Sequence, residues 1–133
     1  MTVKMRGVRG ATTVTENTTD AILQATEEVL VTLIERNNIV EEDVASVLFT
    51  TTPDLTACFP AKAARNLGWR QVALMGFQEV DVPTGLKMCI RVLIHWNTEK
   101  EISELQHVFL RGARALRPDL AKKSDTLVEG ELK

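Results

Sequence analysis

The chain has 133 residues, of which 44% are hydrophobic and 26% charged, as expected for one globular domain with a core of ordinary size. Its formal net charge of -2 leaves no excess of positive charge to attract nucleic acid or anionic membranes. No apolar run approaches the roughly 20 residues that cross a bilayer, and residues 1–14 lack the apolar stretch of a secretory signal. Cys58 and Cys89 form neither a metal-binding spacing nor a disulfide framework, so we expect a cytoplasmic protein.

The first third of the chain predicts a strand followed by a long helix. Residues 3–14 are rich in β-branched side chains and interrupted by glycine, which favours a strand. Alternation along this strand puts Arg6 and Arg9 on opposite faces, so either one of them points toward the core side or both faces are partly solvated. Residues 16–20 carry capping side chains and negative charge, and apolar residues then recur at helical spacing until Asn38.

The rest of the chain adds strands and one short helix, followed by a polar tail. The segments predicted are strands over residues 43–52, 71–79, 88–96 and 105–110, and a short helix over residues 59–67. Residues 118–133 are poor in bulky apolar side chains, so we expect a mobile tail after a single domain of residues 1–117. Together these segments predict an α+β fold with a mixed sheet of about five strands, one long helix and one short one.

The strand predicted at residues 88–96 is apolar on both faces, as a strand buried on both sides would be. A single long helix covers only one face of a sheet. The other face therefore needs a partner, and we expect an oligomer on these grounds alone.

Arg91 interrupts this apolar strand with a permanent positive charge. Burying such a charge without an anion costs on the order of several kcal/mol. Glu79 and Asp81, just before the turn at residues 83–85, are local candidates for the anion, and an anionic ligand is another. A structural salt bridge and a ligand site are both consistent with the pattern.

Familiar catalytic and cofactor motifs are missing from the sequence. It has no dinucleotide or phosphate-binding glycine loop, no nucleophile elbow and no tyrosine. His95 and His107 have no companion at ligand spacing, so we expect no metal, and a Cys89–His95 pair is a weak alternative.

What remains is a set of cations near one carboxylate: Arg9, Lys62, Arg65 and Arg91, with Glu79. Such a set can hold a small dianion and stabilise developing negative charge without a cofactor. Lys62 and Arg65, three residues apart on the short helix, are equally typical of a solvated helix face.

Four blocks of the sequence resemble one family. Residues 6–14 (RGVRGATTV), 52–65 (TPDLTACFPAKAAR), 78–92 (QEVDVPTGLKMCIRV) and 107–120 (HVFLRGARALRPDL) are similar to the small trimeric chorismate mutases of bacteria, the non-helical class. The resemblance runs in collinear order over about residues 4–120. It implies a cofactor-free intramolecular Claisen rearrangement of chorismate to prephenate in aromatic amino-acid biosynthesis. It also implies a homotrimer in the form of a pseudo-α/β barrel, with three active sites at subunit interfaces.

The resemblance also implies roles for individual residues. Arg91 is expected to point at the ether oxygen of the substrate, and Glu79 to accept a hydrogen bond from the substrate hydroxyl. The residues expected to bind substrate or line its pocket are Arg9, Phe59, Arg65, Gly76, Phe109, Leu116 and Arg117. Arg91 and Glu79 are expected from one subunit, and Phe59 and Arg65 from its neighbour.

Two positions depart from the family pattern. Gly76 stands where the family often has a cysteine, and Phe109 where it often has a tyrosine. Each change removes one neutral hydrogen bond, of about 1 kcal/mol, so we expect reduced affinity rather than lost chemistry. The same two changes support an alternative function, a catalytically silent trimeric sensor that binds a small dianion. A scaffold with Arg91 in a closed internal salt bridge is a third possibility.

Overall fold

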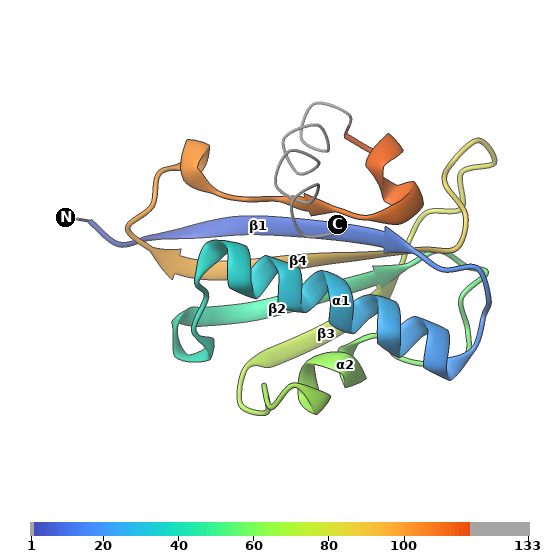
Figure 1. Cartoon of the computed structure of the whole chain (residues 1–133), viewed down its shortest axis with the longest axis horizontal. Coiled ribbons are helices and arrows are strands. Elements are labelled where there is room, and N and C mark those ends of the chain that lie inside the picture. Colours follow the sequence, from blue (N-terminus) through green and yellow to red (C-terminus); the bar gives the residue numbers. More distant parts are fainter. Residues whose placement is uncertain (1, 118–133) are drawn as a thin grey trace, which may run out of the picture.

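The computed structural model describes residues 2–117, which form a five-stranded mixed sheet with α1 and α2 packed on one face (Figure 1). The strands are β1 (Lys4–Thr13), β2 (Val44–Thr51), β3 (Ala73–Gln78), β4 (Cys89–Thr98) and β5 (Val108–Phe109). They lie in the order β3-β2-β4-β1-β5, with β4 antiparallel to β1 and β2, and with β3 and β5 parallel to their neighbours. The helices are α1 (Thr19–Asn37) and α2 (Ala61–Asn66), with 3-10 turns at Glu41–Asp43, Ile102–Glu104 and Arg111–Ala115.

The predicted α+β class, with its mixed sheet, long helix and short helix, is confirmed for this part of the chain. The tail predicted at residues 118–133 lies outside the described residues.

The long helix α1 begins and ends where the local capping signals predict. The Thr18 side chain accepts a hydrogen bond from the Ala21 amide at 3.1 Å, and Asn38 ends the helix in the left-handed conformation with φ of 56°. Gly10 lets the helix approach β1 closely, because a Cβ atom there would lie 2.8 Å from Cδ1 of Leu33. A larger residue at position 10 would push the helix off the sheet.

The two arginines of β1 face opposite sides of the sheet, as alternation predicts. Arg6 lies opposite a buried tryptophan on the helix-covered side, where its Nε donates to the Lys100 carbonyl at 3.2 Å. Its terminal nitrogen is 3.7 Å from a Glu101 carboxylate oxygen. Arg9 lies opposite Leu93 on the other face. The outward-facing arginine of this strand is therefore Arg9.

The second face of the sheet carries neither α1 nor α2, and much of it is exposed. Cross-strand pairing places Leu48, Met75 and Leu93 on this face, on the same side as Arg9. Met75 is 58% exposed and Phe77 46% exposed, which is unusual for large apolar side chains in the middle of a strand. This is the face for which the sequence predicts a partner, and below we call it the bare face.

The last strand, β5, is shorter than the predicted strand at residues 105–110. The Asn37 side chain donates to the Gln106 carbonyl at 3.0 Å and accepts from the Gln106 amide at 2.9 Å. These backbone groups are then unavailable to a neighbouring strand, so only Val108 and Phe109 pair with β1.

Candidate active site

Arg91 lies on β4 and is paired with Glu79, just after β3. Its Nε is 2.8 Å from Oε2 of Glu79, whereas Asp81 lies 3.7 Å from Lys87 instead. The Arg91 side chain is 40% exposed and the Glu79 side chain 15% exposed. The local anion of Arg91 is therefore Glu79, and the pair is open rather than the closed salt bridge of a scaffold.

Glu79 is held by the end of β2 through both its backbone and its side chain. Its amide donates to the Thr51 carbonyl at 2.9 Å, and the Thr50 hydroxyl donates to its Oε2. Thr50 also lies directly opposite Arg91 in the β2–β4 pair. Register thus brings a hydroxyl, a carboxylate and a guanidinium together on the bare face.

Arg91 and Glu79 line an open cavity of about 430 Å³. Arg9 and Phe109 line it as well, and the Arg9 guanidinium carbon lies 5.5 Å from the centroid of the Phe109 ring in a cation–π contact. The Arg9 backbone amide donates to Nδ1 of His107 at 3.1 Å, which ties this part of β1 to the segment before β5. Two cations, one carboxylate and apolar surface are suited to a small dianion that also bears a hydroxyl.

Phe59 and Gly76 line a second cavity, of about 440 Å³. Gly76 pairs with Phe49, whose ring is fully buried on the helix-covered face, whereas Arg91 is on the bare face. Phe77 lines both cavities, and Phe59 is 78% exposed. Within one chain, the predicted site is therefore divided between two cavities separated by β3.

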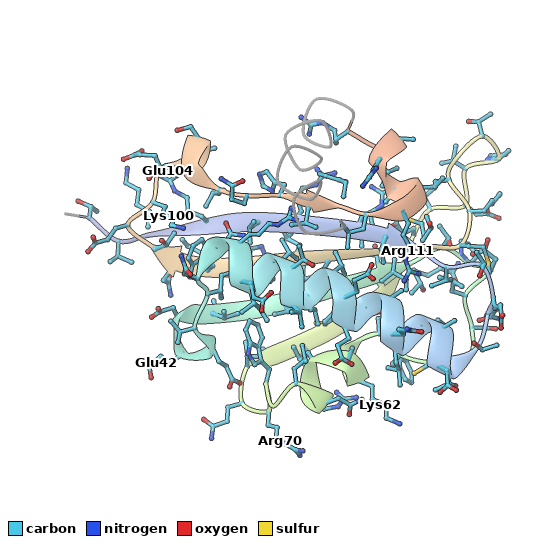
Figure 2. All side chains as sticks on the ribbon, in the orientation of Figure 1. Glu42, Lys62, Arg70, Lys100, Glu104 and Arg111 are labelled. Carbon is cyan, nitrogen blue, oxygen red and sulfur yellow. The ribbon has the colours of Figure 1, made fainter. Side chains whose placement is uncertain are left out.

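The other candidates lie outside both cavities. Arg65 is exposed in the last turn of α2, and Figure 2 shows Lys62 extending from α2 away from the sheet. Leu116 packs against the small cluster that contains Phe109, so it lies close to the first cavity. Arg117 is exposed next to it.

Cys89 is not an activated nucleophile. Burial raises the pKa of its thiol to about 11, and the nearby Arg91 guanidinium offsets only part of that effect. His95 lies six residues further along the same extended strand, roughly 20 Å away, and bonds to the Ser46 hydroxyl at 2.9 Å. The structure does not form the Cys89–His95 pair.

No three His, Cys, Asp or Glu side chains gather closely enough to hold a metal ion within residues 2–117. Over the same residues, no helix combines the length and apolar character needed to cross a membrane.

Comparison with known proteins decides the family. The profile described as chorismate mutase type I matches residues 5–120 of the chain. The chain belongs to the type I chorismate mutase family. It is 50% identical over 117 residues to the chorismate mutase AroH of Thermus thermophilus, and the match covers 87% of this chain and 96% of that one. The chorismate mutase AroH of Bacillus subtilis (strain 168) is 46% identical over 123 residues, covering 92% and 97% of the two chains.

A solved structure agrees with this family assignment. The chorismate mutase from Clostridium thermocellum superposes with a TM-score of 0.81 at 48% identity, over 83% of this chain and 98% of that one. The chain is thus a chorismate mutase, which is an isomerase, as the resemblance implies.

One network in this chorismate mutase was missed from the sequence, and it fixes the start of β4. The Thr52 hydroxyl accepts from the Cys89 amide at 2.9 Å and donates to Asp54, which accepts from the Met88 amide at 3.0 Å. Burial acts to raise the pKa of Asp54, but the hydrogen bonds from Thr52 and Met88 outweigh it and lower that pKa. The network sets the position of β4 two residues before Arg91. The Thr-Pro-Asp sequence was its only signal, because such side chains bond to nearby backbone in turns.

Proposed function

We propose that this chorismate mutase converts chorismate to prephenate in the cavity of Arg91, Glu79 and Arg9, with no cofactor or covalent intermediate. In this rearrangement a C–O bond breaks while a C–C bond forms within one molecule, so no proton has to move. The site has to hold a folded conformer and stabilise negative charge on the ether oxygen. The observation that carries the proposal is that Arg91, although paired with Glu79, stays 40% exposed at an open cavity.

Arg91 is the main catalytic cation in this proposal. Its ion pair with Glu79 is made through Nε, and within residues 2–117 its terminal nitrogens donate no hydrogen bond to a carboxylate. Those nitrogens are then available to the ether oxygen of the substrate. A charge-assisted hydrogen bond strengthens as charge grows on its acceptor, so it stabilises the transition state more than the ground state.

Arg9 and Glu79 orient the substrate. Arg9 binds a substrate carboxylate, and its stacking on Phe109 limits the orientations of the guanidinium. Glu79 accepts a hydrogen bond from the substrate hydroxyl. Phe109 supplies no hydroxyl of its own, which is consistent with the expectation of weaker substrate affinity.

A homotrimer completes the site in this proposal. Phe59 and Gly76 line a separate cavity, and Arg65 is exposed beyond it, so one chain does not bring them to Arg91. The edge strand β3 is largely exposed and carries the apolar Met75 on the bare face. We infer that the bare faces of three copies pack around a common core as a pseudo-α/β barrel. Each interface then joins the Phe59 cavity of one subunit to the Arg91 cavity of the next.

The remaining parts of the proposal concern the rim of the site and its location. Leu116, beside Phe109, and the adjacent Arg117 border the pocket. Two free cysteines suit a reducing cytoplasm, where aromatic amino acids are made.

A spectroscopic assay tests the function directly. Purified protein is incubated with chorismate, and the loss of its ultraviolet absorbance is followed against buffer alone. We expect a large acceleration. Tight binding without turnover would favour the silent dianion sensor, which the family assignment disfavours, and no acceleration would overturn the proposal.

A further inference from the structure

We propose that Thr50 is a positioning residue for the rearrangement. Its hydroxyl holds Glu79 so that one carboxylate oxygen, and the terminal nitrogens of Arg91, stay available to the substrate. The inference rests on the proposed function and adds a residue that the sequence did not indicate.

The register of the sheet places Thr50 next to Arg91 and Glu79 on the bare face. Thr50 is the direct partner of Arg91 in the β2–β4 pair and of Phe77 in the β2–β3 pair. Directly opposed residues share a face, so the Thr50 side chain lies with Arg91 on the bare face and lines the same cavity. Glu79, two residues after Phe77, is tied by its amide to the Thr51 carbonyl at 2.9 Å, which brings its carboxylate within reach of Thr50.

Both contacts to the Glu79 carboxylate fall on the same oxygen. The Thr50 hydroxyl donates to Oε2, and Nε of Arg91 lies 2.8 Å from that atom. The Nε contact is an ion pair without hydrogen-bond alignment, since this N–H has no aligned acceptor among the described residues. The hydroxyl therefore supplies the directional hydrogen bond on Oε2. Within residues 2–117 no hydrogen bond is donated to Oε1, which is left to accept from the substrate.

This arrangement prevents a competing one. A carboxylate next to a guanidinium tends to turn until both oxygens bond the planar fork. Such a bidentate pair would occupy terminal nitrogens of Arg91 and the free oxygen of Glu79 together. By keeping Oε2 engaged, Thr50 makes the one-oxygen contact with Arg91 the more stable arrangement. Loss of the hydroxyl should therefore lower kcat more than it raises KM.

Isosteric substitution separates the hydroxyl from the shape of the side chain. Thr50→Val should lower kcat about tenfold or more, as expected when a hydrogen bond to a charged group is lost. Thr50→Ser keeps the hydroxyl, so its kcat should stay within about threefold of the wild-type value. That decrease is smaller than the one expected when a hydrogen bond to a charged group is removed. If the valine variant folds poorly, Thr50→Ala repeats the test by removing the hydroxyl and the γ-methyl group together. Ser46→Ala is the matched control, because Ser46 is on the same face of β2 but bonds to His95 away from the cavity.

A double-mutant cycle shows whether Thr50 acts through Glu79. In a Glu79→Gln background, Thr50→Val should cause little further loss, because the carboxylate that it positions is already gone. A merely structural role would instead give losses that multiply, and that outcome would overturn the inference. A Thr50→Val variant with full kcat would overturn it as well.

Wild-type turnover keeps the two proposals apart. If the wild type rearranges chorismate and Thr50→Val has the same kcat as wild type, only the proposed role of Thr50 is wrong. If the wild type has no activity, the proposed function and the role of Thr50 fail together.

Discussion

Nε of Arg91 and Oε2 of Glu79 lie 2.8 Å apart in a pair that stays open to a cavity. The carboxylate stabilises the charge of Arg91 inside an apolar strand without covering the guanidinium. Arg91 can then act on a second anion, which a closed salt bridge would not allow.

Replacing Arg91 with citrulline removes its charge while keeping its shape. We expect kcat to fall about 10²- to 10³-fold, as when a single donor to a developing oxyanion is lost. Arg91→Lys, which keeps the charge but loses the planar fork, should retain more activity than citrulline. Steady-state kinetics on semisynthetic protein measures both variants. A citrulline variant close to wild type would contradict the electrostatic account.

Mixing two inactive variants tests whether the site is shared between subunits. Arg91→Ala damages the first cavity, and Phe59→Asp places a carboxylate in the second, where it repels a dianionic substrate. In a ring of three, every mixed trimer contains one interface with neither change. Random co-assembly should therefore restore about a quarter of wild-type activity, from two inactive parents. As the control, the two variants are refolded separately and then mixed under conditions where subunits do not exchange between trimers. If the co-assembled mixture is as inactive as each variant alone, one chain supplies the whole site.

Placing a charge on the bare face should break the assembly. Met75 is 58% exposed in the isolated chain, and Met75→Asp would bury a charge in any interface built on that face. We expect sedimentation to show monomers, with little activity. Ile102→Asp is the control, because Ile102 is 66% exposed on a turn and should leave the assembly intact. If Met75→Asp assembled like wild type, the bare face would not be the interface.

Changes at Phe109 should affect substrate affinity and spare the chemical step. Phe109→Leu removes the ring beneath Arg9, which loosens a proposed carboxylate ligand and should raise KM several-fold, since a cation–π contact contributes about 0.5–2 kcal/mol. Phe109→Tyr keeps the ring and adds a hydroxyl, so KM should fall by up to about tenfold. Initial rates over a range of chorismate concentrations give both parameters. An effect on kcat alone would argue against this role.

The raised pKa of Cys89 predicts a loss of stability at alkaline pH. Below pH 9.0, the ordinary pKa of the thiol, the folded and unfolded chains both hold the proton, so the contribution is complete. As pH rises from 9.0 to about 11, the unfolded chain releases the proton while the folded chain keeps it, so stability falls across that range.

Urea unfolding between pH 8 and 11 measures this loss, the range being set by the pKa of about 11. The free energy of unfolding of Cys89→Ala should fall less steeply with rising pH than that of wild type. Cys58→Ser is the control, because it removes a thiol but leaves Cys89 in place, and it should keep the wild-type slope. Equal slopes for wild type and Cys89→Ala would contradict the prediction.

Elements specified by nearby residues were predicted well. Thr18 and Asn38 mark the ends of α1, because capping bonds join residues within one turn of each other. The predicted strand at 105–110 was too long, because an Asn37 side chain distant in sequence takes the backbone bonds of Gln106. No local pattern carries that information.

The candidate site was likewise predicted only where nearby residues in the sequence specify it. The cost of burying a charge predicted an anion for Arg91 and left Glu79, Asp81 and a ligand as candidates. The structure selected Glu79 and paired Asp81 with Lys87. The sequence did not predict a role for Thr50. A single threonine in a strand gives the same local pattern whether or not its hydroxyl bonds to a carboxylate from another part of the chain.

The amino-acid pattern alone was enough to predict the α+β class, the need of Arg91 for an anion and a sheet face that no helix of the chain covers, because each follows from local periodicity or from burial energy. Only the folded sheet determined that Gly76 and Arg91 open onto different cavities and that Thr50 lies beneath Glu79. Those relationships depend on strand register, and a shift of one residue would move every side chain of a strand to the opposite face.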